Sequence, residues 1–190
     1  LPHWEQTRAW GLARPLSGFA ETFAQMIVEL APGGGSDRPE PDETAEAVLF
    51  VTTGTVELTL SGKAHTMGPG GYAFIPPGVD WTIRNESDGA ATFHWIRKAY
   101  ERVDGIAAPK AFVTSDAEVE PVAMPGTDGR WATTRFVDPD DMAHDMHVNI
   151  VTFEPGAVIP FTETHVMEHG LYVLEGKAVY RLNRDWVEVE

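Results

Sequence analysis

The chain has 190 residues, of which 43% are hydrophobic and 23% charged, a composition typical of a globular protein with a sizeable core. Its formal net charge of −15 argues against a nucleic acid or an anionic membrane surface as a partner, because both need clustered Lys and Arg. The chain contains no Cys, which excludes disulfides and thiolate metal ligands. Any transition-metal site must therefore use His, carboxylate or amide groups.

No apolar run approaches the roughly 20 residues of a membrane-spanning helix. The amino terminus does not show the basic and apolar regions of a signal peptide. We therefore expect an acidic cytoplasmic protein, with no nucleic acid and no membrane as partner.

The first predicted elements are strands, and helical periodicity is weak almost everywhere. A strand-like run at residues 23–30 is followed by a Pro-Gly turn, and a run at 46–54 leads into another at 56–60. In the last of these runs apolar residues occupy alternate positions, as in a half-buried strand. The pattern predicts an all-β fold of short strands and tight turns.

Later residues repeat this order. A run at 146–153 again precedes a Pro-Gly turn, and Glu168-His-Gly-Leu-Tyr-Val-Leu-Glu-Gly176 resembles Glu46-Ala-Val-Leu-Phe-Val-Thr-Thr-Gly54. The two copies are offset by 176 − 54 = 122 residues. Such a repeat predicts two similar structural units in one chain.

We expect two β-barrel halves, at residues 1–105 and 146–190, joined by a linker and connecting strands at 106–145. At the same offset Glu190 corresponds to Gly68 (190 − 122 = 68), so the second copy stops early. A barrel without its last strands leaves unpaired edges and an open core. We therefore expect the second half to be incomplete here and the natural protein to continue.

The second copy carries a group of potential metal ligands. Glu163 and His165 alternate along a predicted strand and so face the same side, and His169 follows on what should be the next strand. Three such side chains can converge on one octahedral ion, and a His and carboxylate set suits Mn, Fe, Ni or Zn. The carboxylate favours the harder ions in this series.

The first copy has lost this group. Subtracting 122 places Pro41, Glu43 and Ala47 at the positions of Glu163, His165 and His169. Its aromatic residues are better explained as core than as a ligand cage, and these are Phe74, Trp81, Phe93 and Trp95. We expect this half to act as a scaffold or interface.

These motifs resemble those of the cupins. The string Glu-x-His-x3-His-x6-Gly, which starts at Glu163, is similar to the first cupin motif with its ligand types permuted. The first copy supplies the second cupin motif as Gly70, Pro76, Gly78 and Asn85, with Trp81 in place of the His ligand. Two motifs on two copies imply a bicupin, two double-stranded β-helix (jelly-roll) barrels with the second truncated.

The run from Glu163 to Leu182 resembles the (S)-ureidoglycine aminohydrolases, manganese bicupins of allantoin degradation also called glyoxylate-induced proteins. The resemblance implies a bound Mn2+ held by Glu163, His165 and His169 and by a Gln expected after Glu190. It also implies a downstream Tyr and Lys that hold the substrate, and a homo-oligomer.

The resemblance implies hydrolysis of (S)-ureidoglycine to (S)-ureidoglycolate and ammonia. A carboxylate ligand such as Glu163 can also bind the substrate amine and move protons, so we expect it to be catalytic and substrate-binding as well as a metal ligand. Two alternatives remain open at this point. One is another metal-dependent bicupin enzyme, a dioxygenase or decarboxylase, and the other is a non-enzymatic ligand-binding cupin.

Overall fold

The computed structural model describes residues 1–14 and 22–190, and these residues form an almost wholly β structure. Besides strands, the described residues contain one helical element, the 3-10 helix η1 (Asp116–Glu118). None of their helices is long and apolar enough to cross a membrane. The all-β prediction is confirmed.

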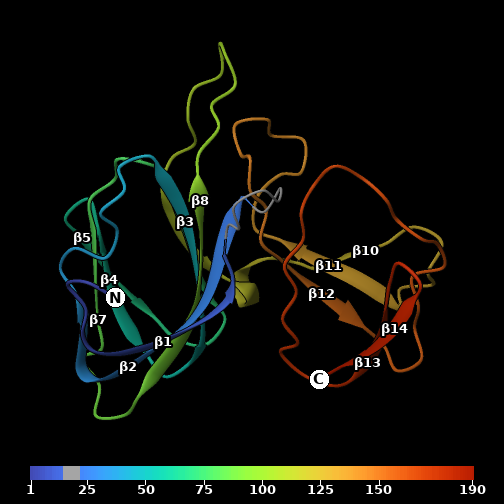
Figure 1. The fold of residues 1–190 in the computed structure, drawn as a ribbon, viewed down its shortest axis with the longest axis horizontal. Helices are drawn as coiled ribbons and strands as arrows, with labels where there is room; N and C mark the ends of the chain where they lie inside the picture. Colours follow the sequence, from blue (N-terminus) through green and yellow to red (C-terminus); the bar gives the residue numbers. More distant parts are fainter. Residues whose placement is uncertain (15–21) are drawn as a thin grey trace.

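The first half is a single nine-stranded antiparallel sheet that curls into a barrel (Figure 1). Its order is β5-β4-β7-β2-β8-β3-β6-β9, and β1 pairs with β2. The strands are β1 (Glu5–Ala13), β2 (Phe23–Ser36), β3 (Ala45–Thr53), β4 (Val56–Leu60), β5 (Lys63–Met67), β6 (Gly71–Ile75), β7 (Trp81–Arg84), β8 (Ala91–Ala99) and β9 (Phe112–Ser115).

The interior of this barrel is an apolar core. Apolar residues alternate along β4 as the sequence predicted, with Val56, Leu58 and Leu60 buried and the residues between them half-buried. The turn from β4 to β5 uses Ser61 and Gly62, both at positive φ, which lets two strands reverse within two residues. The predicted core aromatics Phe74, Trp81, Phe93 and Trp95 are all buried.

A second apolar cluster lies on the outer face of the barrel. Side chains of β3, β6 and β8 that point away from the interior pack there against residues of the second half. The closest aromatic pair is Tyr72 and Phe136, which stack with ring centroids 4.0 Å apart. The two halves therefore share a core at their contact.

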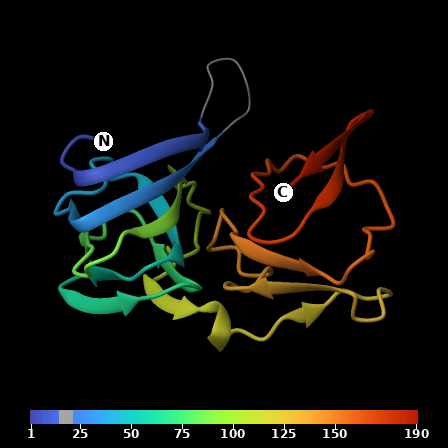
Figure 2. The same ribbon diagram turned by 90° about the horizontal axis from the view of Figure 1, so that it is seen from below.

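The second half is open by comparison (Figure 2). It has a three-stranded sheet of β10 (Val122–Ala123), β11 (Trp131–Arg135) and β12 (Asn149–Phe153), and a hairpin of β13 (Ala178–Leu182) and β14 (Asp185–Val189). Most exposed large apolar side chains of the described residues belong to this half.

One predicted strand is absent from the described second half. Residues 168–176, the repeat of β3, lie outside any strand. In the first half β3 pairs with both β6 and β8. Counterparts of those two neighbours are missing from the described residues, so the segment has no ladder to join.

Candidate metal centre

The three predicted ligands lie in the segment between β12 and β13. Glu163, His165 and His169 are all exposed, and the segment contains no strand within the described residues. Without a strand ladder, nothing in the backbone forces Glu163 and His165 onto one side. Their placement therefore depends on packing rather than on strand pairing.

The structure brings two of the three ligands together. The imidazole rings of His165 and His169 lie with centroids 4.6 Å apart and tilted by 47°. At this separation both rings can present a nitrogen to one ion with metal–nitrogen bonds of about 2.1 Å. In the described part of the chain no three His, Asp or Glu side chains converge on one point, so Glu163 does not join the pair.

The donor set fits a divalent ion of intermediate hardness. Two neutral imidazoles and one carboxylate are ligands that manganese, iron and zinc accept, and the chain has no thiolate to compete. The fit is in donor type and in the approach of the two rings.

Glu168, next to His169, has a different role. Its Oε2 accepts hydrogen bonds from the backbone N–H of Thr22 at 2.6 Å and from the Thr22 hydroxyl at 3.2 Å. These contacts make Glu168 an interface carboxylate. Glu168 joins the ligand segment to the first barrel.

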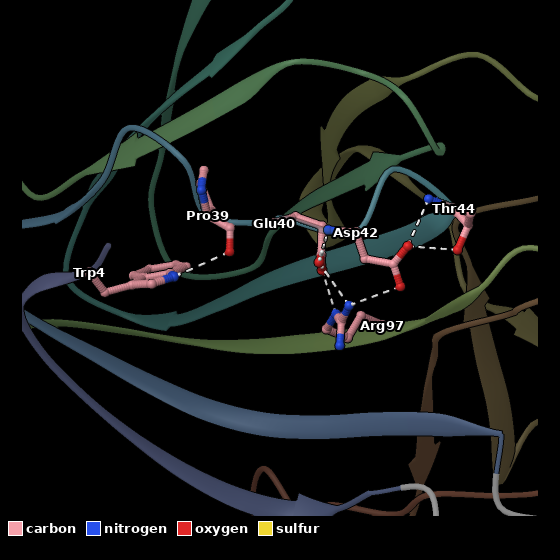
Figure 3. Close-up of polar contacts among 6 residues, drawn as sticks. All are labelled: Trp4, Pro39, Glu40, Asp42, Thr44 and Arg97. Carbon is pink, nitrogen blue, oxygen red and sulfur yellow. Dashed lines mark hydrogen bonds and ion pairs between the residues drawn. The ribbon is translucent and has the colours of Figure 1, made fainter. Parts of the chain in front are cut away.

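In the first barrel, an arginine stands beside the position of a lost ligand. Ala47, which corresponds to His169, pairs with Arg97 across β3 and β8, so both side chains leave the sheet on the same face. The Arg97 guanidinium binds Glu40 through Nε and, at 2.8 Å, through Nη2, and lies 3.8 Å from Asp42 (Figure 3). A fixed protein cation with two carboxylates thus stands near the place that a metal would take.

Arg97, Glu40 and Asp42 close one end of the first barrel, which we call its closed mouth, and neighbouring residues add further contacts there. Asp42 accepts hydrogen bonds from the Thr44 hydroxyl at 2.7 Å and the Thr44 backbone at 2.9 Å, which lower the pKa of its carboxyl together with Arg97. The indole of Trp4 donates to the Pro39 carbonyl at 3.3 Å (Figure 3). The same indole lies 5.3 Å from the Trp95 ring. The lumen is filled by side chains, which supports a scaffold role for this half.

A buried acid lies at the contact between the halves. Glu46 is fully buried on β3, and burial together with Asp145 raises the pKa of its carboxyl to about 9. Neither Glu46 oxygen has a hydrogen-bond donor among the described residues, and Oδ1 of Asp145 has none either. A proton on Glu46 supplies the missing donor, so the neutral acid can bond to Asp145.

Comparisons with known proteins identify the family of this chain. A chain named (S)-ureidoglycine aminohydrolase from Escherichia coli is 31% identical over 192 residues, which cover all of this chain and 71% of the relative. The chain belongs to the (S)-ureidoglycine aminohydrolase family. A relative of the same name from Arabidopsis thaliana is 26% identical, and the chain covers 61% of its length.

Solved structures agree with membership of the (S)-ureidoglycine aminohydrolase family. A Pseudomonas aeruginosa protein described as glyoxylate-induced is 68% identical, with a TM-score of 0.94 over all of this chain and 70% of its own. The Escherichia coli protein Ylba is 30% identical, with a TM-score of 0.86 over all of this chain and 74% of its own. The barrel fold is therefore a cupin fold.

The family model for the Cupin domain matches residues 26–97 of this chain, which run from β2 to β8. That span is the filled first barrel, and the candidate ligands lie outside it. Sequence reasoning did not single out Arg97, Glu40 or Glu46. The acidic run around Asp42 was a visible signal, but its partner Arg97 is distant along the chain, and only the β3–β8 register brings the two together.

Proposed function

We propose that this protein hydrolyses (S)-ureidoglycine to (S)-ureidoglycolate and ammonia in the degradation of purines through allantoin. Membership of the family supports the substrate and the reaction class. The approach of His165 and His169, with centroids 4.6 Å apart, is the single structural observation that carries the proposal. This approach supports the proposal that the two imidazoles bind one ion.

We propose that the resident cofactor is Mn2+, held by Glu163, His165 and His169. The fourth ligand implied by the resemblance is a Gln at the counterpart of Trp81, position 203 (81 + 122), beyond the 190 residues. When bound, the ion polarises the substrate and stabilises negative charge that develops during hydrolysis. The two imidazoles bind as neutral ligands, which requires deprotonated rings.

In this proposal Glu163 has a second task. Hydrolysis breaks the bond from carbon to the amine nitrogen and forms a bond from that carbon to a water oxygen. The carboxylate of Glu163 accepts a hydrogen bond from the amine, takes a proton from the water and returns it to the leaving nitrogen. Ammonia then leaves as a neutral molecule, which costs less than expelling an amide ion.

We further propose a bicupin, with halves at residues 1–105 and 146–190 and a connection at 106–145. The 122-residue offset carries β4 (Val56–Leu60) onto β13 (Ala178–Leu182) and β5 (Lys63–Met67) onto β14 (Asp185–Val189). Positive φ angles recur at the same offset, at Gly54 and Gly176 and at Ser61 and Asn183.

The assembly and location complete the proposal. We propose a homo-oligomer, as the resemblance to the family implies. The acidic, cysteine-free composition suits a cytoplasmic enzyme of small-molecule catabolism.

The test measures metal binding and ammonia release separately. Titration of purified protein with Mn2+ should show saturable binding, and the loaded protein should release ammonia from (S)-ureidoglycine without consuming oxygen. His169→Ala should lose both. Glu163→Gln should lose far more rate than metal, since an amide can still coordinate but cannot move the proton.

A matched control comes from the first barrel. Glu43→Ala removes the counterpart of His165 and should leave both metal content and rate unchanged. Oxygen uptake with no ammonia would instead indicate a redox cupin. Bound Mn2+ with no turnover of any substrate would indicate a non-enzymatic binding protein.

A further inference from the structure

The segment from Glu168 to Tyr172 lies along the outer face of the first barrel, and alternate residues make the contacts. Glu168 accepts two hydrogen bonds from Thr22. Tyr172 packs edge-on against His94 of β8, with ring centroids 4.3 Å apart. Glu168 and Tyr172, four residues apart, therefore both face the barrel.

Gly170, between these two, makes the closest approach. A Cβ at this position would lie 2.4 Å from Oε1 of Gln25 and 3.0 Å from the ring of Phe23, both on β2. There is no room for a side chain unless the neighbours shift, so the backbone itself rests on β2. Three alternate residues, Glu168, Gly170 and Tyr172, therefore contact the first barrel.

This register decides where His169 points. In an extended chain, successive side chains leave on opposite sides, so residues at i, i+2 and i+4 share one side. With residues 168, 170 and 172 on the barrel, His169 is directed away from it. The imidazole of His169 lies against that of His165, with centroids 4.6 Å apart.

The anchor on the barrel is itself rigid. His94 is 5% exposed on β8, which pairs with β2 on one side and β3 on the other. Burial lowers the pKa of the His94 imidazole, so the ring is neutral and stacks as an aromatic. Gln25 is also buried, at 8% exposure. The segment thus rests on side chains that have little freedom to move.

We infer that the outer face of the first barrel positions the metal ligand His169, with Glu168 and Tyr172 as positioning residues that touch neither metal nor substrate. The inference rests on the proposed metal site. It assigns a task to the half that has lost its own ligands. The contacts at residues 168, 170 and 172 leave His169 on the side of the segment that faces away from the barrel.

The experiment compares a disruptive and a conservative double variant in the same protein. Glu168→Ala with Tyr172→Ala removes the acceptor and the ring. Glu168→Gln with Tyr172→Phe keeps an acceptor oxygen for Thr22 and a ring for His94. Glu175→Ala, an exposed acid of the same segment, is the control.

The disruptive pair should weaken Mn2+ binding about 10–100-fold, the usual effect of losing groups that orient a ligand, while kcat at saturating Mn2+ changes little. The conservative pair and the control should stay within twofold of the parent. Amide hydrogen exchange, which needs no metal, should be faster across residues 168–172 in the disruptive pair alone.

Two results would overturn the inference. One is Mn2+ affinity in the disruptive pair equal to that of the control, and the other is unchanged exchange across residues 168–172. Failure of the proposed activity has a different signature. In that case the parent binds Mn2+ and responds to the variants as described but releases no ammonia.

Discussion

Two hairpins, β4–β5 in the first barrel and β13–β14 in the second half, lie 122 residues apart in the chain and differ in what covers them. β4 and β13 stand at equivalent positions of the repeat, yet β4 alternates between buried and half-buried residues while every residue of β13 is exposed. β4 pairs with β5 on one side and β7 on the other, and β13 pairs with β14 alone in the described structure. Alternation in a sequence therefore predicts which side chains share one face of a strand. Whether that face is buried depends on the strands that pair beside it.

The same contrast separates stability from chemistry. The first half has a filled lumen and lacks the candidate metal ligands, while the second half carries these candidates on a segment with no strand among the described residues. A protein with this division should lose fold stability from changes in the first half and metal or activity from changes in the second. The following predictions test that separation.

The largest expected effect comes from the first core. Phe93 is fully buried in the barrel and packs against Trp4, with ring centroids 6.4 Å apart. Phe93→Ala should lower the free energy of unfolding by about 3–5 kcal/mol, because it removes apolar contacts and leaves a cavity. Urea unfolding followed by circular dichroism measures the change.

The matched variant is Phe161→Ala in the second half, where the ring is 56% exposed. It should change the free energy of unfolding by less than about 1 kcal/mol. Equal losses from Phe93 and Phe161 would show that the second half is as well covered in solution as the first. The division between the halves would then be wrong.

The next effect concerns the closed mouth of the first barrel. The Glu40 side chain is only 7% exposed and depends on Arg97. Arg97→Met should lower the free energy of unfolding by about 2–3 kcal/mol, because it leaves a nearly buried carboxylate without its charged donor. Thermal unfolding measures the loss, and Mn2+ content should stay the same.

Arg84→Met is the control for this pair. Arg84 also contacts two carboxylates, but Glu5 and Asp37 are 71% and 75% exposed, so the loss should be below about 1 kcal/mol. A change in Mn2+ affinity on replacing Arg97 would contradict the prediction, since it would connect the first mouth to the metal site.

The smaller pH effect tests the contact between the halves. Glu46 faces Asp145, Lys98 and Tyr72, and the pKa of its carboxyl is raised from 4.5 to about 9. The folded state therefore binds a proton that the unfolded chain releases above pH 4.5. The stability from this proton is complete below about pH 4.5 and declines as pH rises toward 9.

Between pH 7 and 8 the free energy of unfolding should fall by about 1 kcal/mol in the parent protein. Glu46→Gln keeps a donor toward Asp145 and has no proton to lose, so its curve should be flatter across this range. Urea unfolding at several pH values gives both curves. Parallel curves would show that Glu46 is ionised in the folded protein.

The sequence predicts much of the first half because its signals are local. The alternation of apolar residues at Val56, Leu58 and Leu60 depends on neighbours in the chain, and it is confirmed. The core position of Trp81 also followed from its place in a motif that had lost its ligand. These features need no knowledge of distant residues.

The buried charges depend on distant partners, and the sequence did not predict them. Glu46 belongs to a strand and would ordinarily be expected at a surface. Lys98 lies opposite it only through the β3–β8 register, and Asp145 reaches it from a distant part of the chain. The candidate site falls between these cases. Ligand types follow from spacing, while convergence of Glu163 with the two imidazoles depends on strand pairing that the described segment does not have.

The smallest expected effect is on the exposed hairpin. Trp186 on β14 is 68% exposed and lies opposite Arg181, whose guanidinium is 5.8 Å from the indole centre. Trp186→Ser should change the free energy of unfolding by about 0.5 kcal/mol or less, because an exposed indole loses little burial and only a weak cation–π contact. Thermal unfolding at low protein concentration measures it.

Trp81→Ser provides the comparison within the same residue type. Trp81 is 7% exposed and packs edge-on against Trp95, with ring centroids 5.9 Å apart. Its replacement by Ser should lower the free energy of unfolding by at least about 3 kcal/mol. If Trp186→Ser costs as much, another surface covers β14 in solution. Its effect would then depend on protein concentration where a second copy supplies that surface, because dissociation exposes the indole. An effect independent of concentration would place the covering surface within the chain itself, and the openness of the second half would be refuted.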